Sequence, residues 1–144
     1  MLEVFEGVDH IIHAGDIGAM VVLDGLRAVA PVTAVRGNVD RDRWTFDLPD
    51  EVVLQLGGAR LLVRHIKEDV LRLHDPAAEG FTGVIVGHSH APAIDHRGGV
   101  LYLNPGSAGN RRFHLPRSVA ILTVGSDGLQ PELVVLEEGS TATR

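Results

Sequence analysis

The apolar positions of the first forty residues follow two different spacings, which together predict a strand, a helix and a second strand. Residues 9–13 form a short apolar run that ends in Ala-Gly-Asp, as expected of a buried strand entering a loop. From 17 to 30, apolar residues recur at helical spacing until Pro31 ends the pattern. Residues 32–36 form a second strand-like run that stops at Gly-Asn. This order predicts a right-handed βαβ unit with parallel strands.

The remaining two thirds of the chain are predicted to be short strands joined by glycine-containing turns. Residues 67–79 are polar, and Pro76 limits any helix there. Antiparallel pairs are predicted for 52–56 with 60–65, 93–96 with 100–103, and 118–124 with 129–136, and a further buried strand for 82–86. The predicted fold class is therefore α/β, with two packed sheets flanked by helices. We expect one domain over residues 1–138 and a flexible tail at 139–144.

The composition limits which functions and which metal ligands are possible. The 44% apolar and 22% charged residues are typical of a globular protein, and a formal net charge of −6 argues against a general nucleic-acid-binding surface. Because the chain has no cysteine, any metal must be held by nitrogen and oxygen atoms. The sequence has neither an apolar run near the about 20 residues that span a bilayer nor a basic leader, so we expect a cytoplasmic protein without membrane contact.

Residues that commonly bind metals follow the predicted strands. They are Asp16, Asn38, His65, and the closely spaced pair His88 and His90. Loops at the carboxyl ends of strands converge in open α/β sheets, so residues far apart in sequence meet there. Glycine before the histidine pair allows a sharp exit from the strand.

Each of these residues also has a structural explanation. Asp16 is an acceptable N-cap for the predicted helix, and Gly-Asn at Asn38 is ordinary turn chemistry. His65 is compatible with the end of an edge strand. In a chain with eight histidines, two of them two positions apart also arise by chance. No single motif therefore establishes a metal site.

Taken in order, the motifs resemble those of the calcineurin-like metallophosphoesterases, in particular the small bacterial and archaeal phosphodiesterases. The matching segments are His-Ala-Gly-Asp at 13–16, Gly-Asn-Val-Asp at 37–40, the strand-end His65, Gly-His-Ser-His at 87–90 and Asn-Pro-Gly-Ser at 104–107. The resemblance spans residues 9–136 and implies the metallophosphoesterase fold, a four-layer αββα sandwich.

The resemblance also implies roles for individual residues. Asp16 would bridge two divalent ions, Asn38, His65 and His88 would complete one metal shell, and His90 would bind the second ion. Asp16, Asn38, His88 and His90 would then form the catalytic centre for hydrolysis of a small phosphodiester by a dinuclear-metal-activated hydroxide. Manganese is the favoured metal, with Fe, Zn, Ni and Mg as alternatives. The ions, rather than Lys or Arg, would attract the phosphate.

Residues around these motifs receive secondary roles. Asp40 would orient the Asn38 loop or a neighbour of a ligand, and Val39 cannot protonate a leaving group as the histidine of larger phosphatases does. Ile66 replaces the usual glycine after His65 and is expected to displace that loop. Arg36, Arg64 and Arg111 are either substrate contacts or, more simply, surface charges. The histidines His10, His13, His74, His96 and His114 match no ligand position.

The family pattern begins with a strand and an Asp-x-His loop that precede residue 9, and this opening is absent here. Residues 1–7 resemble the end of the helix that follows it, with Leu2 and Phe5 as its core face. A downstream start or shortened chain is the favoured explanation over a true loss, because a missing central strand exposes backbone groups. The expected consequences are impaired activity, a half-built second metal site and a swapped or edge-paired homo-oligomer. The alternative function is a non-catalytic interaction scaffold with a degenerate metal site, as in a eukaryotic vesicle-coat subunit of similar fold.

Overall fold

The computed structural model describes residues 2–38, 40–108 and 117–136. Two α-helices and nine strands form layers, with two short 3-10 helices, η1 and η2, between them. The helical elements are η1 (Leu2–Phe5), α1 (Met20–Arg27), η2 (Arg43–Asp47) and α2 (Lys67–Leu73). The strands are β1 (Ile11–His13), β2 (Val32–Ala34), β3 (Glu51–Leu56), β4 (Ala59–Arg64), β5 (Gly83–Ile85), β6 (Ala93–Arg97), β7 (Val100–Asn104), β8 (Ser118–Gly125) and β9 (Gly128–Val135).

One layer is a five-stranded sheet in the order β3-β4-β5-β7-β6, in which β4, β5 and β7 run parallel. The second layer consists of the parallel pair β1-β2 and the antiparallel pair β8-β9. Among the described residues, no strand joins these two pairs into one sheet. The three predicted hairpins and the parallel βαβ pairing are confirmed.

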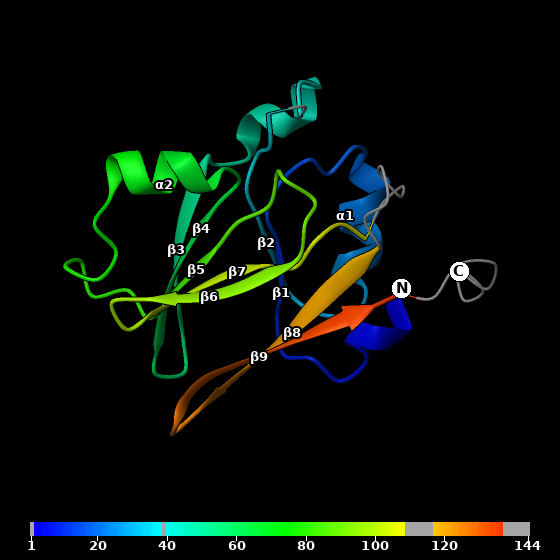
Figure 1. Ribbon diagram of the computed structural model, residues 1–144. Helices are drawn as coiled ribbons and strands as arrows, with labels where there is room; N and C mark the ends of the chain where they lie inside the picture. Colours follow the sequence, from blue (N-terminus) through cyan, green and yellow to red (C-terminus); the bar gives the residue numbers. More distant parts are fainter. Residues whose placement is uncertain (1, 39, 109–116, 137–144) are drawn as a thin grey trace.

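Three apolar clusters hold the layers together. The first lies between α2 and one face of the five-stranded sheet and includes Val70 and Val84. The second fills the space between the two sheet layers, with Leu61 and Val63 at its centre. The third packs Leu26 of α1 against β1-β2. Figure 1 shows the resulting order, with α2 and α1 on the outside and the strands between them. The predicted α/β sandwich is therefore confirmed.

The main difference from the sequence prediction concerns the first helix, which was expected from residue 17 to 30. It spans only Met20–Arg27, because the chain before it takes left-handed backbone conformations at Asp16 (φ 58°) and Gly18 (φ 88°). The N-cap is Ala19, without a side-chain hydrogen bond. Asp16 is therefore not the N-cap of this helix. None of the described helices is long and apolar enough to cross a membrane.

Candidate metal centre

Four of the predicted ligands meet at the carboxyl ends of strands. Asp16 follows β1, Asn38 follows β2, His65 directly follows β4, and His88 follows β5. One ligand atom each from Asp16, His65 and His88 lies within 4.8 Å of the others. Asn38 Oδ1 lies 2.9 Å from His65 Nε2 and 3.2 Å from His88 Nδ1. Two nitrogens and two oxygens therefore converge on one point, as a divalent transition metal requires.

The orientation of His65 is the most informative feature of this cluster. Its Nδ1 lies 2.6 Å from the carbonyl oxygen of Ala14, which can only accept, so Nδ1 carries the hydrogen. The other ring nitrogen, Nε2, faces Asp16 Oδ2 at 3.1 Å and Asn38 Oδ1 at 2.9 Å. When the ring is neutral, Nε2 carries a lone pair, and these three acceptors repel one another unless a cation lies between them. A metal-binding histidine commonly donates its second ring N–H to a carbonyl in this way.

His65 is also firmly placed. The ring is only 4% exposed, and β4 lies inside the sheet between β3 and β5, so His65 does not end an edge strand. Ile66 is the N-cap of α2, and its carbonyl accepts the amide hydrogens of Asp69 and Val70. The expected displacement of this loop by Ile66 is therefore wrong, because His65 remains in the cluster.

Backbone strain is concentrated at the predicted ligands. Among the described residues, the non-glycine residues with positive φ are Asp16 (58°), His88 (70°) and His90 (63°). A non-glycine residue in this region costs roughly 1–3 kcal/mol, and such strain is characteristic of functional sites. The fold thus tolerates an unfavourable backbone at three of the five predicted ligands.

The Asp40 carboxylate holds the loop that carries Asp16. Asp40 is 6% exposed, and its two oxygens accept four backbone N–H groups. The amides of Asp16 and Gly37 donate to Oδ2 at 2.8 Å each, and those of Ile17 and Gly18 donate to Oδ1 at 2.9 and 3.4 Å. The residue was expected to orient the Asn38 loop or a neighbour of a ligand. The hydrogen bonds agree with this expectation and extend it, because the carboxylate ties the β1 and β2 loops together and thereby positions Asp16 relative to Asn38.

Two glycines allow these loops to approach closely. A Cβ atom at Gly37 would collide with the side chain and backbone nitrogen of Asp16. At Gly15 (φ 104°) it would lie 2.6 Å from His65 Nδ1 and 2.9 Å from the Gly37 backbone. The glycine at each position is therefore required by the packing of the ligand loops.

The Asn-Pro-Gly-Ser segment supports the loop that carries the paired histidines. Asn104, at the end of β7, is 7% exposed and donates from Nδ2 to the Gly87 carbonyl and to Ser89 Oγ, both at 3.0 Å. Its Oδ1 accepts the amide hydrogen of Gly106 at 2.9 Å. The sequence resemblance singled out this segment without explaining it, and the structure shows that it anchors residues 87–90.

His90 is the one predicted ligand that lies outside this cluster. It is partly buried and adopts the same left-handed backbone as His88, but its ring is not part of the group formed by Asp16, His65 and His88. Predictions that involve Val39, Arg111, His114 and the tail at 139–144 fall outside the described residues.

His13 is a neighbour of the centre that the sequence analysis assigned no role. Its Nδ1 accepts the amide hydrogen of Gly15 at 3.2 Å, which requires an unprotonated nitrogen. Burial lowers the pKa of His13 and nearby His65 lowers it further, against the opposing effect of Asp40 and Asp16. His13 therefore remains neutral and holds the turn before Asp16. Its place directly before the Ala-Gly-Asp turn was the available signal.

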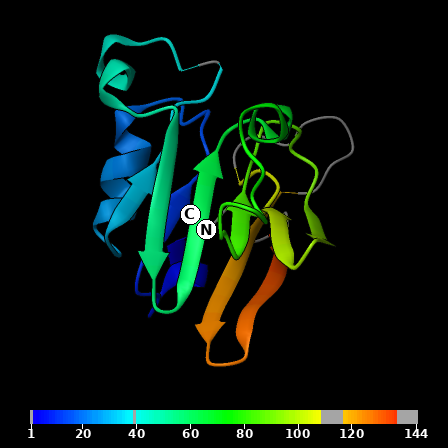
Figure 2. The ribbon, with the colours of Figure 1, turned by 90° about the vertical axis from the view of Figure 1, so that its left-hand side faces the viewer.

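A cavity of about 600 Å³ opens beside the cluster, between the ends of β2 and β4 and the η2 segment. Its lining includes the predicted ligands Asn38 and His65, together with Phe46 of η2. Arg36 and Arg64, expected either to contact substrate or to be surface charges, also line it. Arg36 pairs with Asp50 at 2.9 Å and Arg64 with Glu51 at 3.2 Å. Figure 2 shows η2 (teal) at the end of the molecule where β4 ends.

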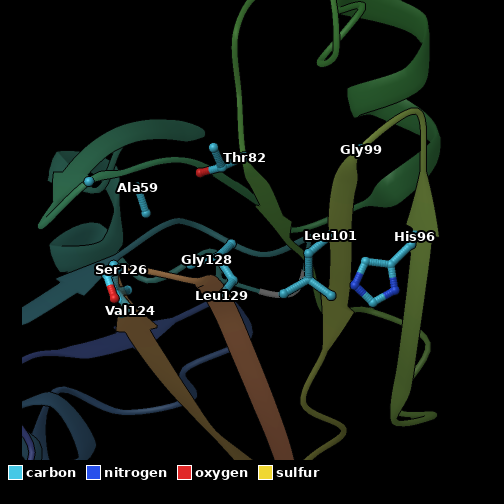
Figure 3. A pocket seen from close by; sticks show the side chains of 11 residues that line it. Ala59, Thr82, His96, Gly99, Leu101, Val124, Ser126, Gly128 and Leu129 are labelled. Atoms are coloured by element: carbon cyan, nitrogen blue, oxygen red, sulfur yellow. The ribbon is translucent and has the colours of Figure 1, made fainter.

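A second cavity, of about 530 Å³, lies at the other end of the strands. It is lined by the starts of β4 and β7, by Thr82 and by the three hairpin turns, with His96 of β6 at its side (Figure 3). Because β4, β5 and β7 are parallel, this cavity lies at their amino ends, whereas the ligand cluster lies at their carboxyl ends. It is therefore separate from the candidate metal centre.

Comparisons with known proteins show the family of the chain. Residues 1–127 match the family described as the calcineurin-like phosphoesterase superfamily domain. A probable metallophosphoesterase of Methanocaldococcus jannaschii is 36% identical over 140 residues, which cover 93% of this chain and 70% of the relative.

Solved structures show the same fold. An archaeal phosphodiesterase superposes with a TM-score of 0.75 at 22% identity, covering 92% of this chain and 88% of the other. Vps29 from Entamoeba histolytica, in complex with zinc, gives 0.72 at 20% identity, with coverages of 93% and 87%. At these identities the two structures support the fold alone.

Proposed function

Because the chain belongs to the calcineurin-like phosphoesterase superfamily, we propose that it is a metal-dependent phosphodiesterase acting on small phosphodiesters. One observation carries the proposal: Nε2 of His65 faces oxygens of Asp16 and Asn38, with His88 alongside. This donor set suits Mn, Fe or Zn through its nitrogens and oxygens. Manganese is the metal we propose.

The residues divide the work of the site between binding and orientation. Asp16, Asn38, His65 and His88 would hold one divalent ion, and His90 would serve a second ion bridged by Asp16. Divalent ions supply Lewis-acid polarisation of the phosphoryl oxygens and a lowered pKa for water. The position of the ion would depend on Asp40, which holds the loop that carries Asp16.

Two of the arginines near the cluster are already paired, which favours a metal as the main source of positive charge for the phosphate. Arg36 and Arg64, which line the adjoining cavity, are each already paired with a carboxylate. The chain as a whole carries a formal charge of −6, which repels an anionic phosphate substrate. Metal charge at the cluster would overcome this repulsion locally.

The test combines metal binding with turnover. We expect the protein to bind Mn²⁺ in calorimetric titration and then to hydrolyse bis(p-nitrophenyl) phosphate, whereas Asp16→Ala and His65→Ala lose both properties. His96→Ala, which removes a histidine from the remote cavity, is the matched control and should behave as the wild type. Metal binding without turnover of any activated diester would instead favour a scaffold with a vestigial metal site.

A further inference from the structure

Phe46, which lines the cavity beside the candidate metal centre, is unusually exposed for a phenylalanine. It is 63% exposed, although a phenylalanine normally gains about 1.5–3 kcal/mol from burial. It lies on η2 and lines the same cavity as the ligands Asn38 and His65. An exposed aromatic ring beside a catalytic cluster offers a flat apolar surface to whatever is attached to the reacting phosphate.

Most of the charged side chains that line this cavity already have partners. Asp50 pairs with Arg36, Asp69 pairs with Arg72 at 3.3 Å, and the Asp40 carboxylate is taken up by backbone amides. Arg41 also lines the cavity, and within the described part of the chain it makes no hydrogen bond or ion pair. The cavity therefore combines an aromatic surface, an ion pair with exposed edges and one available positive charge.

We propose that this cavity binds the nucleoside part of a nucleotide phosphodiester, with the base stacked on Phe46 and Arg41 attracting the phosphate. The proposal rests on the phosphodiesterase function proposed above and specifies its substrate. A volume of about 600 Å³ is within the roughly 300–1,000 Å³ typical of small-molecule sites. Every base has a face that stacks on an aromatic ring.

A base is favoured over a plain aromatic group by the Arg36–Asp50 pair. Asp50 is about 60% exposed and Arg36 about 32%, so the pair presents both an acceptor and donors at the cavity wall. The edge of a nucleobase carries complementary donors and acceptors, whereas a phenyl ring has none. The same chemistry distinguishes a nucleotide from an aryl ester.

The test compares a nucleotide with two phosphate esters that lack the base. Binding of adenosine 5′-monophosphate, ribose 5-phosphate and phenyl phosphate to the Mn²⁺-loaded protein is measured by calorimetry. We expect the nucleotide to bind roughly five- to 150-fold more tightly than ribose 5-phosphate, in line with the energy of base stacking. Phe46→Ala should remove this difference and leave ribose 5-phosphate unchanged, whereas Phe46→Tyr should retain it.

Leu73→Ala is the control, because Leu73 is also an exposed apolar residue but does not line the cavity. Equal binding of the nucleotide and ribose 5-phosphate by the wild type would overturn the proposal. Phenyl phosphate binding as tightly as the nucleotide would also overturn it. A Phe46→Ala variant whose self-association changes, but whose affinity for the nucleotide relative to ribose 5-phosphate does not, would overturn it as well. Absence of Mn²⁺ binding would refute the metal centre itself, whereas binding of Mn²⁺ and ribose 5-phosphate without base preference refutes the nucleoside site alone.

Discussion

Replacing Asp40 by asparagine tests whether one buried carboxylate positions the metal-binding loops. An asparagine has one acceptor oxygen instead of two, so it can retain only one pair of the backbone amides. The better arrangement keeps the two 2.8 Å bonds from Asp16 and Gly37 and turns the new NH₂ group toward the amides of Ile17 and Gly18. Donors then face donors at those two positions.

The expected loss follows from these bonds. A hydrogen bond to a charged group contributes about 1.5–3 kcal/mol, and the 3.4 Å bond from Gly18 contributes least. Loss of the Ile17 bond, together with weakening of the retained pair, predicts a fall of about 2–4 kcal/mol in the free energy of unfolding. This corresponds to a decrease of roughly 4–16 °C in Tm. Because the Asp16 loop is loosened, Mn²⁺ affinity should fall by about 10–100-fold.

Denaturant unfolding of the metal-free protein gives the first quantity and calorimetric titration with Mn²⁺ the second. Asp42→Asn is the matched control, because it removes the same charge from the same loop at an exposed position with no side-chain capping bond. Its stability should lie within about 0.5 kcal/mol of the wild type. If Asp40→Asn and Asp42→Asn unfold at the same denaturant concentration and bind Mn²⁺ equally, Asp40 does not position the site.

Further predictions concern packing, loop support and pH. Gly37→Ala should reduce Mn²⁺ binding more than tenfold in titration, since its methyl group would occupy the space of a ligand loop; an unchanged affinity would contradict the packing argument. Asn104→Ala, which leaves the His-Ser-His loop without its anchor, should cost about 1–3 kcal/mol in chemical unfolding and speed amide exchange in that loop. The hydrogen bond to Glu79 raises the pKa of His74, so the interaction stabilises the fold below pH 6.5 and is lost as pH rises through the higher folded pKa. The Tm difference between wild type and His74→Gln should therefore be larger at pH 5.5 than at pH 9, and a difference independent of pH would contradict this linkage.

Local patterns in the sequence were sufficient for most of the secondary structure. The hairpins follow from strand-like runs separated by glycine turns, which are properties of neighbouring residues. The 3-10 helix η2 was not predicted, because residues 43–47 have neither a helical nor a strand repeat. The length of α1 was also wrong, since the amides before it bond to Asp40, a residue from a distant loop.

For the candidate site, too, local sequence patterns predicted some features and left others open. Sequence order predicted Asp16, Asn38, His65, His88 and His90 as ligands, because each follows a predicted strand and matches a family motif, and the structure brings the first four together. It left open whether Asp16 capped a helix and whether His65 ended an edge strand. Both alternatives depended on where a helix begins and which strand lies at an edge, which local patterns do not determine.

The sequence by itself therefore determined the α/β class, the βαβ and hairpin units and the chemical types of the ligands. Tertiary structure alone decided that four of the predicted ligands share one point, that His65 Nε2 faces two oxygens, and that Phe46 lines the adjoining cavity. The physical reason is the distance along the chain over which each interaction acts. Hydrophobic periodicity and turn chemistry act between neighbours in sequence. A metal shell forms only when the packing of the sheets brings distant loops within a few ångströms of one another.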